Sequence, residues 1–135
     1  MNLLLISVAL YAIACCLPAL EFKNSASPND VMLGVRALAV GWSGIFGGVT
    51  AWYANPFWVF SLLLAWLRRP LLAIVAAGIA VAIACTIFSD LGRELPGDEG
   101  GVTRTTMVRL LPGFYAWVAS MIVVPVTILL QRVSR

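Results

Sequence analysis

The stretch Gly34–Asn55, GVRALAVGWSGIFGGVTAWYAN, decides how this chain is expected to fold. Its small residues recur at alternating intervals of three and four, which places them along one face of a helix. In lipid, such a face lets two helix backbones approach closely, and Gly44 and Gly48 form a GxxxG pair within it. We call this pattern the small-residue seam, and it consists of Gly34, Ala37, Gly41, Gly44, Gly48 and Ala51.

The seam is expected to be a contact face between helices. Residues 3–20 and 71–88 offer small residues at matching intervals, which favours packing inside one bundle. A face for dimerisation or for a partner protein is the alternative.

The polar pair Asn55-Pro56 ends this stretch and lies between two aromatic clusters. Asparagine is preferred as a helix cap, proline is favoured at the first helical position, and the residue before proline is pushed out of helical geometry. The pair therefore predicts a tight turn, with Asn55 capping the helix that Pro56 begins. A kinked helix or an interfacial arrangement is the alternative.

The composition of the whole chain is that of a membrane protein. Of its 135 residues, 61% are hydrophobic and 11% are charged, and the mean hydropathy is +0.97. A soluble domain is about half apolar and a quarter charged. We therefore expect an all-α integral membrane protein of one domain, a compact bundle of five apolar helical segments. These are residues 3–20, 31–54, 56–69, 71–88 and 107–130.

The short third segment leaves the number of spans open. Its apolar part, from Pro56 to Leu67, would cover about 18 Å as a helix, against a hydrocarbon core of about 30 Å. Arg68 and Arg69 can extend it by reaching to the headgroups. Five spans are favoured. If the third segment lies at the interface instead, four helices cross and the amino terminus changes side.

Arginines predict the orientation of the bundle. Arg68 and Arg69 mark one turn, and Arg132 and Arg135 mark the carboxyl-terminal tail. Since basic residues are enriched on the cytoplasmic side, both are expected there, and the acidic loop 89–106 is expected to be external. The short loops suit a multi-pass protein of the bacterial inner membrane.

Residue types that carry catalysis are scarce. The chain has no histidine and three cysteines, all within apolar runs, and its membrane serines have no carboxylate or lysine partner at helical spacing. The sequence therefore predicts no enzyme activity, no cofactor and no metal site. A scattered net charge of +3 predicts no nucleic-acid surface.

Polar residues inside apolar segments are the remaining functional candidates. Arg36 shares a face of the second segment with Ser43 and Thr50, and Arg109 lies near the start of the fifth. They are predicted to line a polar path or to contact lipid. The simpler interpretation of Arg36 is a side chain that reaches from a helix end to the headgroups.

The function favoured by these patterns is contact with other proteins inside the membrane, as an accessory subunit or a protective, immunity-type factor. The expected partners are the lipid bilayer and another membrane protein or a second copy of this chain. The alternative is a small oligomeric channel or transporter, with a weakly polar path along the second segment formed by Arg36, Ser43, Thr50 and Asn55.

Overall fold

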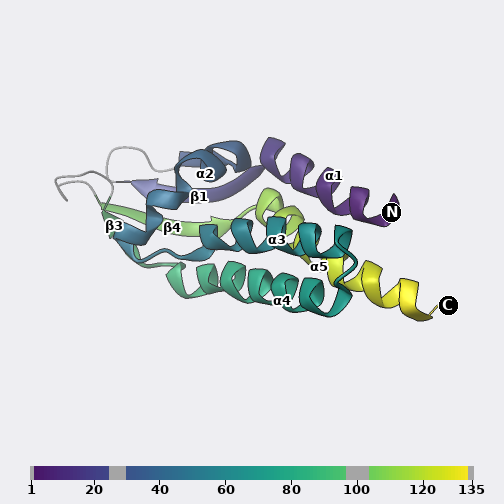
Figure 1. Cartoon of the computed structure of the whole chain (residues 1–135). Helices are drawn as coiled ribbons and strands as arrows, with labels where there is room; N and C mark the ends of the chain where they lie inside the picture. The colour runs from purple at the N-terminus through teal and green to yellow at the C-terminus, as the bar shows by residue number, and fades with distance from the viewer. Residues whose placement is uncertain (1, 25–29, 97–103, 134–135) are drawn as a thin grey trace.

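The structure is a computed structural model that describes residues 2–24, 30–96 and 104–133. Within these ranges, Figure 1 shows long helices side by side and a small sheet with short helices at one end. The long helices are α1 (Asn2–Cys16), α3 (Ala54–Trp66), α4 (Pro70–Cys85) and α5 (Pro112–Val133). Helix α1 begins and α5 ends at the end of the bundle far from the sheet.

The bundle is held by three main helix contacts. Helix α1 packs on α5, α5 packs on α4, and α4 packs on α3. Their shared core includes Trp58 from α3, Ala77 from α4, and Met121 and Val124 from α5.

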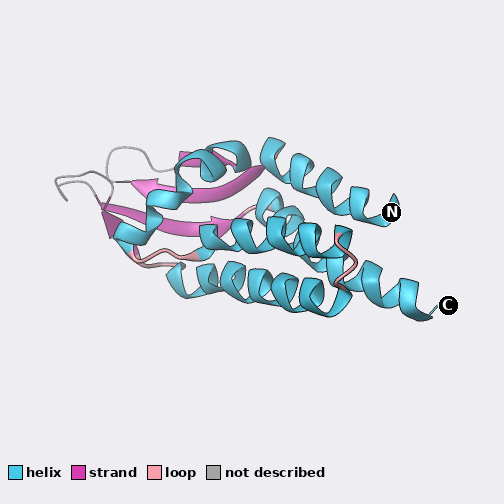
Figure 2. Ribbon diagram, viewed as in Figure 1, coloured by secondary structure: helices cyan, strands magenta, loops and turns pink. Residues whose placement is uncertain are grey.

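The sheet has four antiparallel strands in the order β2-β1-β4-β3 (Figure 2). They are β1 (Pro18–Asn24), β2 (Asp30–Leu33), β3 (Glu94–Pro96) and β4 (Arg104–Leu110). The central pair β1–β4 joins the two halves of the chain, with Leu20 opposite Leu110 and Phe22 opposite Met107. The sheet therefore cannot form from either half alone.

Pro18 explains why the first apolar segment changes from helix to strand. Proline has no N–H to donate, and it disfavours helical geometry in the residue before it. Helix α1 accordingly ends at Cys16, and β1 begins at Pro18. From there, Leu20 and Phe22 pack against a small core that includes Met107 and Phe114. The predicted helix over 3–20 is wrong beyond Cys16.

The second predicted helix, over 31–54, is also wrong. The segment divides into β2, α2 (Gly34–Val40), η1 (Gly41–Gly47) and η2 (Ala51–Tyr53), where η denotes a 3₁₀-helix. Glycine costs about 1 kcal/mol relative to alanine inside a helix, and η1 contains three glycines. Gly48 then takes a left-handed conformation, with φ of 79°, and ends the helical run. The glycines that predicted a packing face instead break the helix.

The predicted fold class, an all-α bundle with five spans, is therefore corrected in two respects. The chain contains an antiparallel sheet, and within the described residues two helical stretches are long and apolar enough to cross a membrane. These are Pro70–Asp90 and Pro112–Gln131, with mean hydropathies of 2.7 and 2.0. Leu4–Cys16 is a shorter apolar helix. Length and composition alone support a span at these positions.

The last two predicted segments differ from the structure at their ends. Segment 71–88 corresponds to α4 followed by the short helix η3 (Thr86–Asp90). Segment 107–130 begins as strand β4, and its helix α5 starts at Pro112, where proline suits the first turn. The expected loop 89–106 contains β3 and the start of β4, and its residues 97–103 lie outside the described residues.

The Asn55-Pro56 pair lies inside the first turn of α3, not before it. Helix α3 begins at Ala54, and the residue in the cap position is Tyr53. The Asn55 amide nitrogen donates to the Trp52 carbonyl oxygen at 2.9 Å, so this side chain does not cap the helix. The prediction of Asn55 as a cap and Pro56 as the first helical residue is wrong, although a break does precede α3.

Helix α3 ends in a Schellman motif at the end of the bundle far from the sheet. The Arg68 N–H bonds to the Ala65 carbonyl oxygen, and the Arg69 N–H bonds to that of Leu64. Arg68 has a φ of 57°, a left-handed conformation that costs a non-glycine residue roughly 1–2 kcal/mol. A basic side chain therefore stands where glycine is usual, at the tight turn into α4.

Candidate functional site

On helix α4, large side chains face outward and small ones face inward. The buried side of α4 consists of alanines, namely Ala73, Ala76, Ala77, Ala80 and Ala84. Its exposed side carries Leu71, Leu72, Val75 and Ile79. In water, the hydrophobic effect would bury the larger groups. In lipid, small residues at the contacts let helices pack closely, which is the arrangement seen here.

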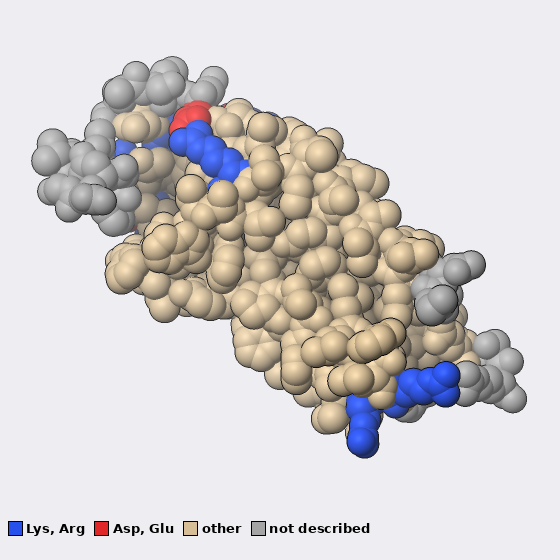
Figure 3. All heavy atoms as spheres, turned by 45° about the horizontal axis from the view of Figure 1, so that its top comes forward, with Lys and Arg blue, Asp and Glu red and all other residues tan. Residues whose placement is uncertain are grey.

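Charged groups lie near the two ends of the molecule. Figure 3 shows basic side chains at one end, acidic and basic side chains toward the other, and a broad uncharged surface between them. Helices α1, α3 and α4 contain no charged residue, and α5 has one arginine, in its last turn. The uncharged surface therefore follows the helices.

A polar cluster of the buried Asn55 with the half-buried Tyr11 and Trp117 lies where the bundle meets the sheet end. The Asn55 side-chain oxygen accepts hydrogen bonds from the Tyr11 hydroxyl at 3.0 Å and the Trp117 indole N–H at 2.8 Å. Since an indole nitrogen can only donate, these bonds fix the orientation of the Asn55 amide. The cluster links α1, α3 and α5 through one side chain that is 8% exposed.

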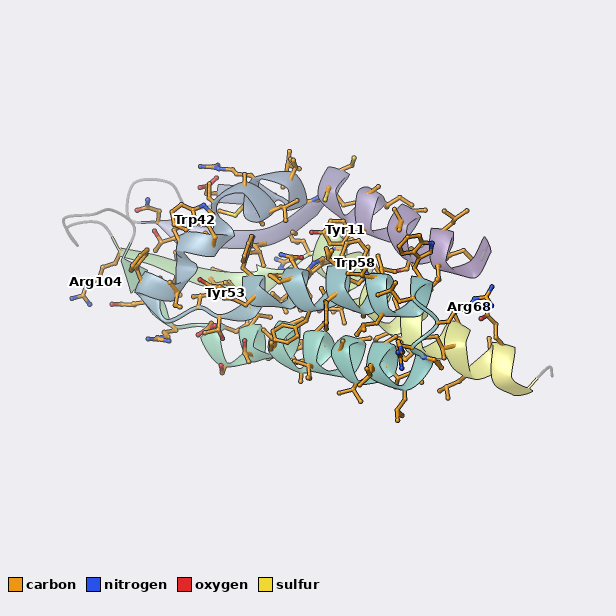
Figure 4. The ribbon with its side chains drawn as sticks, in the orientation of Figure 1. Tyr11, Trp42, Tyr53, Trp58, Arg68 and Arg104 are labelled. Atoms are coloured by element: carbon orange, nitrogen blue, oxygen red, sulfur yellow. The ribbon has the colours of Figure 1, made fainter. Side chains whose placement is uncertain are left out.

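A second buried cluster lies deeper among the same helices. The Trp58 indole N–H donates to the Ser7 hydroxyl oxygen at 3.0 Å, and the Ser7 hydroxyl donates to the Ser120 carbonyl oxygen at 2.6 Å. Trp58 also stacks on Tyr11, with ring centroids 4.0 Å apart (Figure 4). These contacts place all polar atoms of Ser7 and Trp58 in hydrogen bonds and align α1 with α3 and α5.

An apolar cavity of about 310 Å³ lies between the sheet, the α2–η1 segment and the adjacent end of the bundle. Its sheet wall includes Leu20, Phe22 and Met107, and Asn55 borders it from the bundle side. The chain enters this region through η2, whose Trp52 indole donates to the Leu38 carbonyl oxygen of α2 at 2.8 Å. That bond holds α2 over the cavity.

The small-residue seam lines this cavity. Five of its six members border the open space, and they are Gly34, Ala37, Gly41, Gly44 and Ala51. The sixth, Gly48, lies outside the lining and packs near the Arg93 guanidinium group. In the structure the seam borders a cavity, and Gly34 also packs closely against the end of α1.

The predicted polar path is dispersed in the structure. Ser43 and Asn55 border the same cavity, whereas the Thr50 hydroxyl lies 3.2 Å from the Thr86 hydroxyl. The Ser43 hydroxyl is itself bonded to the Val40 carbonyl oxygen at 2.7 Å.

The two arginines of that prediction lie elsewhere. Arg36 is exposed on α2, and Arg109 pairs with Glu21 across β1 and β4 at 3.4 Å. These positions do not form one continuous polar path.

The outer side of α2 and η1 is apolar and exposed. We call it the η1 surface, and it consists of Val35, Val40, Trp42, Ile45 and Phe46. Phe46 is 84% exposed, the largest value among the large hydrophobic side chains of the described residues. Figure 4 shows Trp42 at the sheet end, away from Arg68.

Local sequence patterns did not reveal the Tyr11–Asn55–Trp117 cluster or the cavity beside it. The three residues come from three separate segments, so no local spacing connects them. The available signal was Asn55 itself, because an amide within an apolar region requires buried hydrogen-bond partners.

No protein family model, curated protein or solved structure matches this chain. The geometry of the site therefore stands alone in supporting a function.

Proposed function

We propose that this chain is a multi-pass membrane protein that works through contacts with another membrane protein. In this proposal α1, α3, α4 and α5 lie in the bilayer, and the η1 surface is the contact face. The outward-facing large side chains and buried alanines of α4 support the membrane setting. The shorter α1 and α3, of 15 and 13 residues, would be accommodated by local thinning of the bilayer or by residues beyond their ends.

The proposed orientation places the sheet outside and the opposite end of the bundle in the cytoplasm, in a bacterial inner membrane. Arg68 and Arg69 lie at the turn from α3 to α4, and α1 begins and α5 ends at that same end. An excess of basic residues favours the cytoplasmic side. Both termini would then be cytoplasmic, and the second apolar segment would be the one that does not cross.

Cysteine labelling in intact cells tests this orientation. In a chain whose native cysteines are replaced by alanine, Arg104→Cys is expected to react with a membrane-impermeant maleimide. Arg68→Cys is expected to react only after the cells are permeabilised. The reverse pattern would overturn the orientation, and equal labelling of both in intact cells would contradict the membrane setting.

The irregular backbone beneath the η1 surface is one reason to propose that a protein partner binds there. Irregular backbone facing lipid is excluded from the hydrocarbon region, where its polar groups lack partners. The run η1–Gly48–η2 is irregular, so it must lie outside the hydrocarbon or be covered by protein. Outside the hydrocarbon, a cluster containing Trp42 and the highly exposed Phe46 is the kind of apolar patch that marks an interaction site.

The observation that carries the proposal is the 84% exposure of Phe46, and matched substitutions test it. Phe46→Ser and Phe60→Ser make the same change at two exposed positions, one on η1 and one on α3. The native assembly extracted in mild detergent is expected to contain a second protein. Phe46→Ser is expected to release that protein while Phe60→Ser retains it, with thermal unfolding of the chain itself unchanged.

Three outcomes would count against the contact function. Extraction of the wild-type chain as a monomer would contradict the proposal. A pure homo-oligomer would favour the channel-type alternative over an accessory role. Retention of the partner by Phe46→Ser would show that the contact face lies elsewhere.

A further inference from the structure

We propose that the cavity beneath α2 binds a neutral, lipid-like molecule with one hydrogen-bond-accepting oxygen on a hydrocarbon body. This inference goes beyond the contact function, since it concerns the inner side of α2 and η1 and not the exposed η1 surface. The cavity volume of about 310 Å³ lies at the lower end of the range found for small-molecule sites.

The space exists because of the residues on α2 and η1. Ala37, Gly41 and Gly44 contribute little or no side chain to the wall, whereas the facing walls carry Phe22, Met107 and Phe114. The cavity is held open from its edges, because Trp52 packs against Gly41 and is bonded to the Leu38 carbonyl oxygen. A larger side chain at Ala37 would fill part of it, whereas side chains at Gly41 and Gly44 would meet Trp52 and Val49.

The lining excludes a charged ligand. No aspartate, glutamate, lysine or arginine is among the described residues that border the cavity. An ion placed there would lose its hydration without gaining a counter-charge, which is strongly unfavourable. Hydrocarbon and aromatic walls instead favour an apolar body, and they include Tyr11, Trp52, Phe114 and Trp117.

Asn55 supplies the one polar feature that selects the ligand. Its oxygen already accepts two hydrogen bonds, from Tyr11 and Trp117, and one of its two N–H groups donates to Trp52. The second N–H is the donor left for a ligand, because a carboxamide nitrogen carries two hydrogens. A ketone, ester or alcohol oxygen at the head of a hydrocarbon chain would complete the bonding of this amide.

The probe for this site is 2-decanone, whose size suits the space. A cavity of about 310 Å³ is within the range of volumes found for small-molecule sites. In lipid nanodiscs, 2-decanone is expected to raise the unfolding temperature of the wild-type chain, because a ligand that binds the folded state stabilises it. Decane, which lacks the oxygen, is expected to bind about three- to tenfold more weakly.

Paired variants locate the binding. Ala37→Leu fills the cavity and is expected to weaken 2-decanone binding at least about tenfold. Ala39→Leu makes the same change at an exposed position of α2 that does not border the cavity, and it is expected to bind like the parent. Leu38→Phe serves as the second cavity-filling variant if Ala37→Leu fails to fold.

Each remaining outcome would overturn the inference. Equal binding by the cavity-filling and control variants would show that the ketone binds elsewhere, for example in the bilayer. If decane bound as tightly as 2-decanone, Asn55 would not select the ligand. If the decanoate anion bound as tightly as 2-decanone, the ligand would not need to be neutral. None of these results depends on the partner protein of the η1 surface.

Discussion

Gly34→Ala is expected to lower the free energy of unfolding by about 3 kcal/mol or more, the upper range for overpacking a tight contact. A β-carbon at Gly34 would stand 2.1 Å from the Ala14 carbonyl oxygen and 3.0 Å from the Cys15 α-carbon. These are backbone atoms, so a change of rotamer cannot relieve the clash. The Gly34 N–H also donates to the Leu17 carbonyl oxygen at 2.9 Å, which holds α2 against the end of α1.

Gly78→Ala is the matched control for this experiment. A β-carbon at Gly78 would meet no other atom within 4 Å, and the residue lies in the middle of α4. Alanine is better than glycine inside a helix by about 1 kcal/mol, so this variant is expected to be more stable than the parent. Both are measured by reversible unfolding in the same detergent. Similar stabilities of the two variants would show that α1 and α2 do not meet closely at Gly34.

Asn55→Leu is expected to destabilise the fold by about 3–5 kcal/mol, although leucine has a similar size. The change leaves the Tyr11 hydroxyl and the Trp117 indole N–H without their acceptor, and each unsatisfied buried group costs about 1–3 kcal/mol. It also removes the bond from Asn55 to the Trp52 carbonyl oxygen, where η2 joins α3. Unfolding monitored by tryptophan fluorescence measures the loss.

Tyr11→Phe provides the comparison for Asn55. It removes one hydroxyl while Asn55 keeps its bond from Trp117 and the ring at position 11 can still stack on Trp58. The expected loss is about 1 kcal/mol, the net contribution of an ordinary hydrogen bond. A loss for Asn55→Leu no larger than this would show that Asn55 does not organise the cluster.

Composition and length predicted part of this fold. The apolar run after Arg69 contains no glycine except Gly78 and is rich in alanine, the best helix former, and it forms α4 close to the expected bounds. The fifth segment contains a long helix too, because Pro112 can begin a helix even though it cannot continue one from β4. Both helices have the length and hydropathy that the composition indicated.

The sheet was not predictable from local patterns. Strands β1 and β4 are short and adjoin apolar helices, so their residues extended the expected hydrophobic runs of 3–20 and 107–130. What stabilises them is their pairing with each other, and that pairing joins residues far apart in the chain. Alternation over so few residues is a weak signal beside a long apolar run.

The seam was expected to be one face of a regular helix, whereas the structure has the short helix α2 followed by η1. Spacing of three and four residues would align Gly41, Gly44 and Gly48 on a regular helix, and it was taken to indicate one. The same glycines have no side chains to stabilise that helix, so the segment tightens into η1 and turns at Gly48. The cavity that the seam borders could not be predicted, because its other walls come from β1, β4 and α5.

The pairing of β1 with β4 has a consequence for the order of events during synthesis. Leu20 and its partner Leu110 are about 90 residues apart, so at ~5–20 residues per second β1 is made roughly 5–18 seconds before β4 exists. Until then, the edge of β1 that β4 will cover is open to strands of other chains. Glu21 and Lys23 lie on β1, and charged side chains discourage such pairing. The charged side chains of β1 thus oppose pairing with other chains during the time before β4 is made.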